Sequence, residues 1–455
     1  MTGPDLRRIG DIAALVRAGG VSPVDLVQGC LDQIESRPRV NAFIIVLGDR
    51  ALDEAATAEH EIRAGRWRGP LHGIPVAVKD LIDVAGTRTT SGSAVPSTEA
   101  AEDAPLVRRL RNAGAIVIGK TNLHEFAFGT TSEESAFGPV RNPLDETRSA
   151  GGSSGGSAAA LAAGMCFAAV GTDTGGSIRI PSAACGTVGL KPTYGEIPIA
   201  GVVPLSTSFD HAGPMTRGVA DAALLLAVMK GASHAAMPQP PRRLVLGVPG
   251  PLFCDRVEDD VAAMLARVRG ALEDAGHAVL DVEIENARWT ADVYLHVMLP
   301  EASAWHAPLL ERHASSYSPG VRLRLEMGRY VLAEDYLRAQ ALRRALGAGV
   351  DRALDGCDAL LLPALPMGAP PLGAATVEIA GRTEPVRGAM LRLTQLFNMT
   401  GHPSIALPGG AGRDGLPRGL QLVGRRRATG RLLAVAAAVE RQISGGPGSV
   451  GGGTG

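Results

Sequence analysis

The sequence has no excess of charge of either sign. Its 455 residues contain 45 Lys and Arg against 46 Asp and Glu, a formal net charge of −1 at pH 7. Proteins that bind nucleic-acid backbones or anionic membrane surfaces usually carry an excess of basic residues. We therefore expect no nucleic-acid partner and no membrane partner, and the expected substrate is a small molecule or a peptide-like compound.

Cysteine and histidine are few and scattered. The five cysteines include no Cys-x-x-Cys pair, and the ten histidines include no His-Glu-x-x-His motif. Zinc sites in proteins usually show ligand spacings of this kind. The sequence therefore predicts free, mostly buried thiols, no metal and no cofactor.

Long apolar runs are also missing. The most apolar long stretch, residues 158–170, is shorter than the ~20 residues that a membrane-spanning helix needs. The first residues mix acidic and basic side chains and contain no continuous apolar segment of the kind found in signal peptides. Both observations favour a cytoplasmic location.

Lysine is the scarcest of the charged residues. The four that occur are Lys79, Lys120, Lys191 and Lys230. A general preference for arginine explains the ratio, but lysine can lose its proton in a protein whereas arginine cannot. Lys79 directly follows the apolar run Ile74–Val78, which makes it a candidate general base. Taken alone, it would more often be a strand-end lysine that extends its charge to solvent.

The order of the patterns indicates an α/β fold. Ser22, Pro23 and Asp25 are typical of a helix start, and the helix should run to about Ser36. From residue 70 to 230, short apolar runs alternate with Gly-rich turns and helical patterns, which is typical of a protein with a central sheet. A helix is also expected over Asp259–Asp274. The strand-like runs are Ile74–Val78, Ile116–Ile118, Phe167–Val170, Leu244–Val248, Ala359–Leu362, Ser404–Leu407 and Gly419–Val423.

These elements suggest one large domain, residues 1–443, with a mixed central β-sheet flanked by helices. The core should lie at about 70–230, and a helical insertion at about 286–355 should shape a substrate pocket. Residues 444–455, rich in Gly and Ser, are expected to form a flexible tail.

Two short motifs match known functional patterns but fail on context. Residues 114–121 fit the P-loop pattern, yet their variable positions Ala-Ile-Val-Ile resemble a strand rather than a phosphate-binding loop. Residues 152–156 fit the nucleophile elbow of α/β-hydrolases, which needs a buried strand before it, whereas residues 142–150 read as a polar loop. We reject both interpretations.

Four longer blocks, in order, resemble the amidase signature family. They are GPLHGIPVAVKDLIDVAG around Lys79, IGKTNLHEFAFG at 118–129, RSAGGSSGGSAAALAAG at 148–164 and GTDTGGSIRIPSAACGTVGLKPTYG at 171–195. Residues 397–404 and 415–424 also look like that family, so the resemblance runs nearly end to end. Several separate blocks are much more specific than a single Gly-rich loop.

The resemblance assigns roles to individual residues. It implies that Ser177 is the nucleophile, that Ser153, in a cis peptide, is the proton relay, and that Lys79 is the base. It also implies supporting residues around this triad. The backbone amides of the oxyanion hole are those of Thr174, Gly175, Gly176 and Ser177, and the residues that hold the loop in shape are Asp173 and Arg179. We also expect Ser154 to assist through hydrogen bonding, and Phe126, Gly129 and Thr130, in the loop up to Ser132, to bind the substrate.

This assignment sets a physical condition. Lysine has an ordinary pKa near 10.4, so a base at neutral pH needs burial that lowers this pKa by about 2 to 3 units. The apolar residues around Lys79 can supply that environment. The same acyl-enzyme route would serve amides, anilides, esters and carbamates, including urethanes and aryl acylamides, because each presents a carbonyl to the nucleophile.

Three alternatives remain. The run Gly151–Ser157 could be a linker, but a buried helix pattern follows it at once. The chain could be the glutaminase-like subunit of a tRNA-dependent amidotransferase; such subunits usually carry Val-Ser-Arg-Tyr-Gly and Ala-Ser-Ser-Leu-Asp-Gln segments, whereas residues 196–201 and 205–211 read differently. It could also be a binding protein on an amidase scaffold, which the complete set of residues disfavours.

Overall fold

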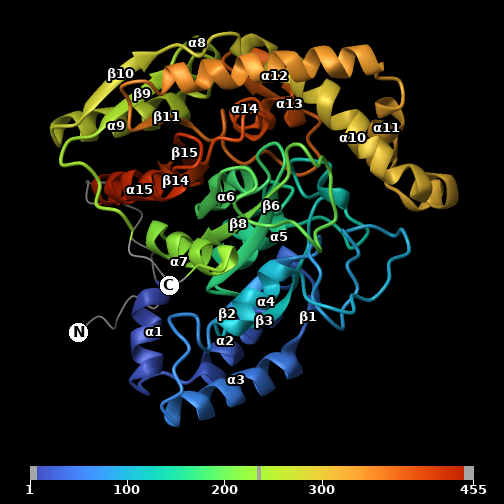
Figure 1. Cartoon of the computed structure of the whole chain (residues 1–455), viewed down its shortest axis with the longest axis vertical. Helices are drawn as coiled ribbons and strands as arrows, with labels where there is room; N and C mark the ends of the chain where they lie inside the picture. Colours follow the sequence, from blue (N-terminus) through green and yellow to red (C-terminus); the bar gives the residue numbers. More distant parts are fainter. Residues whose placement is uncertain (1–7, 233–236, 445–455) are drawn as a thin grey trace.

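The computed structural model describes residues 8–232 and 237–444. Within these residues, 11 strands form one mixed sheet that runs through the molecule, with helices on both faces (Figure 1). In spatial order the strands are β1 (Phe43–Val46), β3 (Ile116–Thr121), β2 (Pro75–Lys79), β6 (Ala168–Asp173), β8 (His211–Thr216), β7 (Val188–Lys191), β14 (Ser404–Ala411), β15 (Pro417–Val423), β11 (Ala359–Pro363), β9 (Val245–Pro249) and β10 (Ala278–Val282). The expected α/β domain with a mixed sheet is confirmed.

The helices fall into an early and a late group. Those of the first half are α1 (Ile9–Arg17), α2 (Pro23–Ser36), α3 (Gly48–Arg63), α4 (Pro105–Asn112), α5 (Gly155–Ala162), α6 (Arg179–Cys185) and α7 (Val219–Lys230). Those of the second half are α8 (Pro251–Cys254), α9 (Asp259–Asp274), α10 (Thr290–His313), α11 (Pro319–Gly328), α12 (Ala333–Ala353), α13 (Val386–Leu391), α14 (Gln395–Met399) and α15 (Thr429–Ser444). In Figure 1, α10, α11 and α12 lie at one end of the molecule and α2 and α3 at the other.

Local sequence explains several of these boundaries. The Ser22 side chain accepts a hydrogen bond from the N–H of Val24, and Pro23 is the first residue of α2, which ends at Ser36 as predicted. Asp25 lies in the first turn, where its charge suits the helix dipole. The helix predicted over Asp259–Asp274 is α9, with the same bounds.

The buried strands show which side chains face which layer. Val76 and Val78 belong to one apolar cluster and Ala77, between them, to another, because successive side chains of a strand point to opposite faces. The P-loop interpretation is excluded by β3, which contains three of the four variable positions that would have to form the loop. Residues 141–149 correct one prediction: they form the hairpin β4 (Arg141–Asn142) and β5 (Asp145–Ser149) rather than a loop.

The helical segment predicted at about 286–355 contains α10, α11 and α12. Of the predicted tail at 444–455, Ser444 is the last residue of α15 and the rest lies outside the described residues. All five cysteines are free thiols, and all but Cys254 are buried. In the described ranges, no helix combines the length and the apolar character needed to cross a membrane.

Candidate active site

Lys79 lies where two parallel strands end side by side. Val78 of β2 pairs in register with Val170 of β6, so the residues that follow reach the same edge of the sheet. There the Lys79 side chain is completely buried. Its Nζ donates to Ser153 Oγ at 2.8 Å and to Thr172 Oγ1 at 2.7 Å. The structure thus brings the predicted base and the predicted relay into direct contact.

Ser153 is held from several sides. The peptide bond between Gly152 and Ser153 is cis, as expected. The Ser153 carbonyl accepts hydrogen bonds from the N–H of His124 and from Ser132 Oγ, both at 3.1 Å. These contacts fix the main chain of a completely buried residue whose hydroxyl faces Lys79.

The loop that carries Ser177 packs against the Ser153 segment. The N–H of Ser154 donates to the Ser177 carbonyl at 3.1 Å, so the two Gly-rich blocks of the sequence are in contact. Ser177 is 6% exposed, whereas Ser153 is fully buried. Among the described residues, Ser177 Oγ has no hydrogen-bond partner, which leaves it available to a substrate.

Burial lowers the pKa of Lys79 to about 7, although the carboxylates of Asp173 and Asp210 act in the opposite direction. The reason is that an ammonium ion loses its hydration in an apolar interior, and hydroxyl groups replace it only in part. Close to neutral pH, a substantial fraction of the Lys79 side chain is therefore an uncharged amine.

The segment between β6 and α6 exposes main-chain donors. Within the described part of the chain, the N–H groups of Thr174, Gly175, Gly176 and Ser177 are not paired with a protein acceptor. Gly176 has φ +144°, and a Cβ there would lie 2.2 Å from Thr394 Oγ1. A Cβ on Gly175 would lie 2.5 Å from the Tyr294 hydroxyl oxygen. Only glycine fits at these two positions, because the backbone runs so close to its neighbours.

A buried ion pair holds the base of this loop. Arg179 donates to both carboxylate oxygens of Asp173, through Nε and Nη2, at 3.0 Å each. Burial raises the pKa of Asp173, but Arg179, Lys191 and the hydrogen bond from Asn398 together outweigh this effect and lower the pKa, so the carboxyl stays ionised. Asn398 Nδ2 also donates to the Asp173 carboxylate at 2.8 Å, and Arg179 Nη1 donates to Gln421 Oε1 at 2.6 Å. Both buried charges are therefore matched, as such pairs require.

Ser154 has a different environment from Ser153. Its Oγ donates to the Thr172 carbonyl at 3.1 Å and accepts from the Thr172 N–H at 3.3 Å. These bonds tie the residue after the relay to strand β6. They do not connect its hydroxyl to Lys79 or to Ser177.

The predicted substrate loop meets the helical segment. The Phe126 ring lies edge-on to His306 at 4.5 Å and stacks on Tyr317 at 5.3 Å, measured between ring centroids. His306 belongs to α10, so residues from distant parts of the sequence form one wall. Phe126 has a positive φ of 49°, which turns the chain sharply there.

Gly129 and Thr130 belong to the same loop and lie close to the segment that carries Ser153. A Cβ on Gly129 would lie 2.0 Å from His124 Nε2, and a Cβ on Gly152 would lie 3.0 Å from the Thr130 carbonyl carbon. Gly129 therefore permits close packing against His124, and Thr130 lies against the Gly152 backbone. Both positions support the site through packing.

Sequence reasoning missed Thr172 and Asp210. Thr172 stands within the fourth matched block, next to Asp173, and its position in a strand parallel to β2 was the available signal. Asp210 accepts from Thr174 Oγ1 at 2.6 Å and from the N–H groups of Leu205 and Ser206. Burial raises the pKa of Asp210 to about 6, although these hydrogen bonds oppose the shift. No local pattern pointed to this contact.

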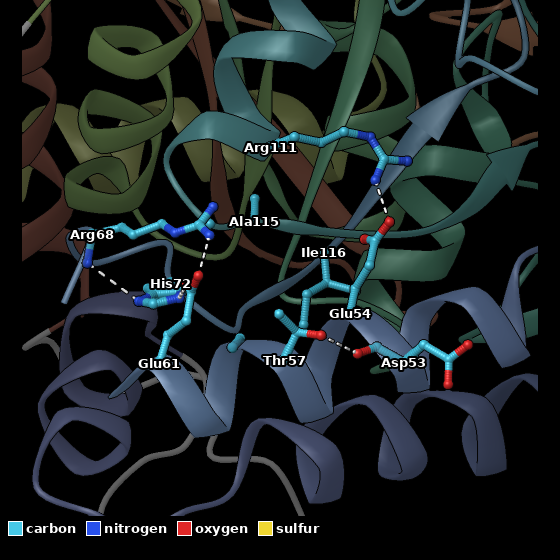
Figure 2. Close-up of a pocket in the computed structure, with 11 residues that line it drawn as sticks. Asp53, Glu54, Thr57, Glu61, Arg68, His72, Arg111, Ala115 and Ile116 are labelled. Carbon is cyan, nitrogen blue, oxygen red and sulfur yellow. Dashed lines mark hydrogen bonds and ion pairs between the residues drawn. The ribbon is translucent and has the colours of Figure 1, made fainter. Parts of the chain in front are cut away.

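Two surface cavities lie away from Ser177. In the larger, about 330 Å³, the side chains come from α3 and from the segments around His72 and Ile116 (Figure 2). Both of its arginines are paired: Arg68 Nη2 lies 2.7 Å from Glu61 Oε1, and Arg111 is bonded to Glu54. The other cavity, about 220 Å³, lies around Phe253 and Ala287. In the chain as described, no group of three or more His, Cys, Asp or Glu side chains is placed to hold a metal.

Comparison with known proteins agrees with this geometry. The family model described as Amidase matches residues 25–433. An amidase of Pseudomonas putida is 41% identical over 428 residues, covering 90% of each chain. One subunit of the glutamyl-tRNA(Gln) amidotransferase of Nitratidesulfovibrio vulgaris (strain DP4) is 36% identical, covering 92% of this chain and 93% of the relative. A crystal structure of an amidase superposes with a TM-score of 0.92 at 40% identity, covering 96% of this chain and 99% of that one.

The mixed α/β sheet, the buried lysine and serine at its edge and these similarities together define a hydrolase. More particularly, the chain belongs to the amidase signature family and is an amidohydrolase. The match over residues 25–433 includes both halves of the sheet, so the assignment applies to the domain as a whole.

Proposed function

We propose that the protein hydrolyses linear amide C–N bonds of small molecules through an acyl-enzyme, with Ser177 as nucleophile, Ser153 as proton relay and Lys79 as base. The observation that carries this proposal is the environment of Lys79. Its Nζ is fully buried and hydrogen-bonded to the hydroxyls of Ser153 and Thr172, and its pKa lies at about 7.

The proton path follows from these contacts. An uncharged Lys79 amine can donate to Thr172 and accept the proton of Ser153, which in turn takes the proton of Ser177 as this oxygen attacks the carbonyl carbon. When the C–N bond breaks, the proton returns along the same path to the leaving nitrogen. Water then repeats the sequence and releases the acid, so no further reactant is needed.

The tetrahedral oxyanion needs donors that are already in place. The N–H groups of Thr174, Gly175, Gly176 and Ser177 support this role because they lack acceptors within the described chain. Losing one such donor typically costs about 2.7 to 4 kcal/mol of transition-state stabilisation. We assign Asp173, Arg179 and Ser154 to positioning, because their bonds hold the two loops rather than reach the reacting atoms.

The substrate range within the acyl class is a further part of the proposal. Phe126, Gly129 and Thr130 would shape the wall next to the acyl group, with Phe126 closed against His306. Anilides, carbamates and esters present the same carbonyl, so aryl acylamides and urethanes are candidate substrates beside primary amides. A screen of the pure protein against one substrate of each class, under identical conditions, ranks them.

A glutaminase-like subunit of a tRNA-dependent amidotransferase is the alternative, favoured by the similarity to such subunits. The segments at 196–201 and 205–211 argue for a stand-alone amidase. An assay of the purified protein distinguishes the two functions. Hydrolysis of simple amides at full rate by the protein alone supports our proposal. Glutamine hydrolysis that appears only with partner proteins would support the alternative.

The role of Ser177 can be tested with a fluorophosphonate, which forms a bond to an activated serine hydroxyl. We expect mass spectrometry to place one adduct on Ser177 in the wild type and none in Ser177→Ala. Ser182→Ala is the matched control, because Ser182 is also buried, lies on α6 and has no hydrogen-bond partner for its hydroxyl in the described chain. Equal labelling of Ser177→Ala and the wild type would refute the assignment.

A further inference from the structure

Arg387 lies on the side of helix α13 that faces the nucleophile loop. It is four residues before Leu391 in the same helix, and such residues share a face. Leu391 Cδ2 would lie 2.9 Å from a Cβ on Gly175, which places this face against the loop that leads to Ser177. Arg387 therefore lies one helical turn before the residue that contacts the loop of main-chain donors.

This guanidinium has no anionic partner of its own. Within residues 8–232 and 237–444, Arg387 forms no hydrogen bond and no ion pair, and its Nε is buried without an acceptor. Its guanidinium carbon lies 5.9 Å from the centroid of the Phe128 ring. Other arginines of this region are matched: Arg392 pairs with Glu384 at 2.9 Å, and Arg343 donates to the carbonyls of Met399 and Ser208.

The charges around Arg387 leave one positive charge in excess. Arg324 approaches the same Phe128 ring to 5.3 Å and takes the nearby carboxylate, with its Nη2 2.9 Å from Glu134 Oε2. Glu134 is thus taken by Arg324, and among the described residues Arg387 is left without a carboxylate in contact. Burial lowers the pKa of Arg387, yet arginine stays protonated in proteins, so the charge remains. A half-buried charge without a partner is costly unless a ligand supplies one.

A neutral donor lies beside it. The Tyr294 hydroxyl approaches Gly175, and within the described residues it has no hydrogen-bond partner. Burial raises the pKa of Tyr294, although the charge of Arg387 acts in the opposite direction, so the hydroxyl keeps its proton and can donate. A guanidinium fork and a phenol hydroxyl next to the nucleophile loop are suited to a carboxylate, which accepts several hydrogen bonds at once.

We propose that Arg387, with the Tyr294 hydroxyl, binds a carboxylate carried by the substrate, so that the preferred substrates are amides of small molecules with a second, anionic acid group. This inference rests on the proposed function, because the carboxylate must bind while its neighbouring carbonyl lies at Ser177. It makes Arg387 a specificity-determining residue, with its guanidinium held against the Phe128 ring.

The experiment compares two fluorophosphonates that differ only at the end of the chain, one with a carboxylate and one with the isosteric carboxamide. For the wild type we expect Ser177 to react at least about tenfold faster with the carboxylate probe, the difference that a charge-assisted hydrogen bond makes. In Arg387→Gln the ratio of the two rates should fall to about one. Arg387→Lys, which keeps the charge but not the fork, should give an intermediate ratio.

Arg109→Gln is the matched control. Arg109 lies on helix α4, is also half-buried and donates a hydrogen bond to the main-chain carbonyl of Met229. This variant should keep the wild-type ratio. A wild-type ratio near one, or an unchanged ratio in Arg387→Gln, overturns this inference while leaving the nucleophile assignment intact. Failure of both probes to modify Ser177 would instead overturn the proposed function on which the inference rests.

Discussion

Lys79 and Lys120 lie on adjacent strands and are equally buried, but their surroundings differ. Both side chains are 0% exposed, and Val78 pairs with Lys120 across β2 and β3. Lys120 Nζ lies 2.7 Å from the Asp80 carboxylate and also donates to Thr89 Oγ1 at 2.8 Å. Among the described residues, Lys79 Nζ forms hydrogen bonds only with the hydroxyls of Ser153 and Thr172.

The difference separates a structural lysine from a reactive one. Burial lowers the pKa of both, but for Lys120 the adjacent carboxylate of Asp80 opposes the shift through contact and charge. For Lys79 the acidic groups are farther away, and Asp173 is already matched by Arg179. A buried lysine becomes a base at neutral pH when hydroxyls rather than carboxylates surround it.

Replacement of each lysine by methionine should separate the two roles most strongly. Lys79→Met should lower kcat/KM by on the order of 10³-fold or more, because the proton of Ser153 has no acceptor. Lys79→Arg should be equally inactive, since arginine keeps its proton. Steady-state kinetics on a neutral anilide measure both. Near-normal rates in Lys79→Arg would refute the assignment of Lys79 as the general base.

Lys120→Met is the counterpart and should act on stability instead. It leaves the buried Asp80 carboxylate unpaired, which costs about 3 to 5 kcal/mol of unfolding free energy. Urea unfolding checks this value. Should Lys120→Met keep full stability and lose activity as Lys79→Met does, the contrast between the two lysines would be wrong.

Thr172→Asp should give Lys79 the carboxylate that Lys120 has. A carboxylate in contact raises a neighbouring pKa by about 1 to 3 units, so kcat/KM at pH 7 should fall by about 10- to 10³-fold and recover at higher pH. Thr172→Asn is the isosteric control without the charge. If the aspartate and asparagine variants have the same pH profile, the charge around Lys79 does not set its reactivity.

The wild-type pH profile should show the base losing its proton. Because the pKa of Lys79 is lowered to about 7, the uncharged amine predominates above that pH, and the protonated form below it cannot accept a proton. We expect kcat/KM to rise about tenfold per pH unit below 7 and to level off above it. A rate that falls as pH increases from 5 to 8 would contradict this sign.

A chelator should have the smallest effect. The proposed proton path uses an amine and two hydroxyls, so EDTA should change kcat/KM by less than about twofold, whereas an enzyme with a metal-activated water loses its nucleophile when the metal is removed. Dialysis against EDTA followed by assay tests this. Loss of activity that added zinc restores would require a different mechanism.

Much of the framework was predictable because local patterns determine it. The apolar runs at 74–78, 359–362 and 404–407 correspond to β2, β11 and β14 within one or a few residues, since central strands are buried on both faces. The hairpin of β4 and β5 was missed because its residues are mostly polar. Strand β8 (HAGPMT) was missed because Gly and Pro are unusual in strands.

The residues of the active site also divide into those that local patterns reveal and those that they do not. Lys79, Ser153 and Ser177 stand in matched blocks, so their residue types and order were visible in the sequence. Tyr294 and Arg387 lie in segments with no motif. Only tertiary packing brings Tyr294 and Leu391, which shares a helix face with Arg387, to Gly175. Contacts between distant segments depend on how the sheet and helices pack, which a single sequence does not specify.

The most direct test of the central claim is the pKa of Lys79 itself. With only four lysines in the chain, ¹³C-labelled lysine gives a spectrum of four side-chain signals, and the signal missing from Lys79→Met identifies residue 79. We expect that signal to titrate with a midpoint near pH 7, in step with kcat/KM. A midpoint above about pH 9, close to that of an ordinary lysine, would contradict the account.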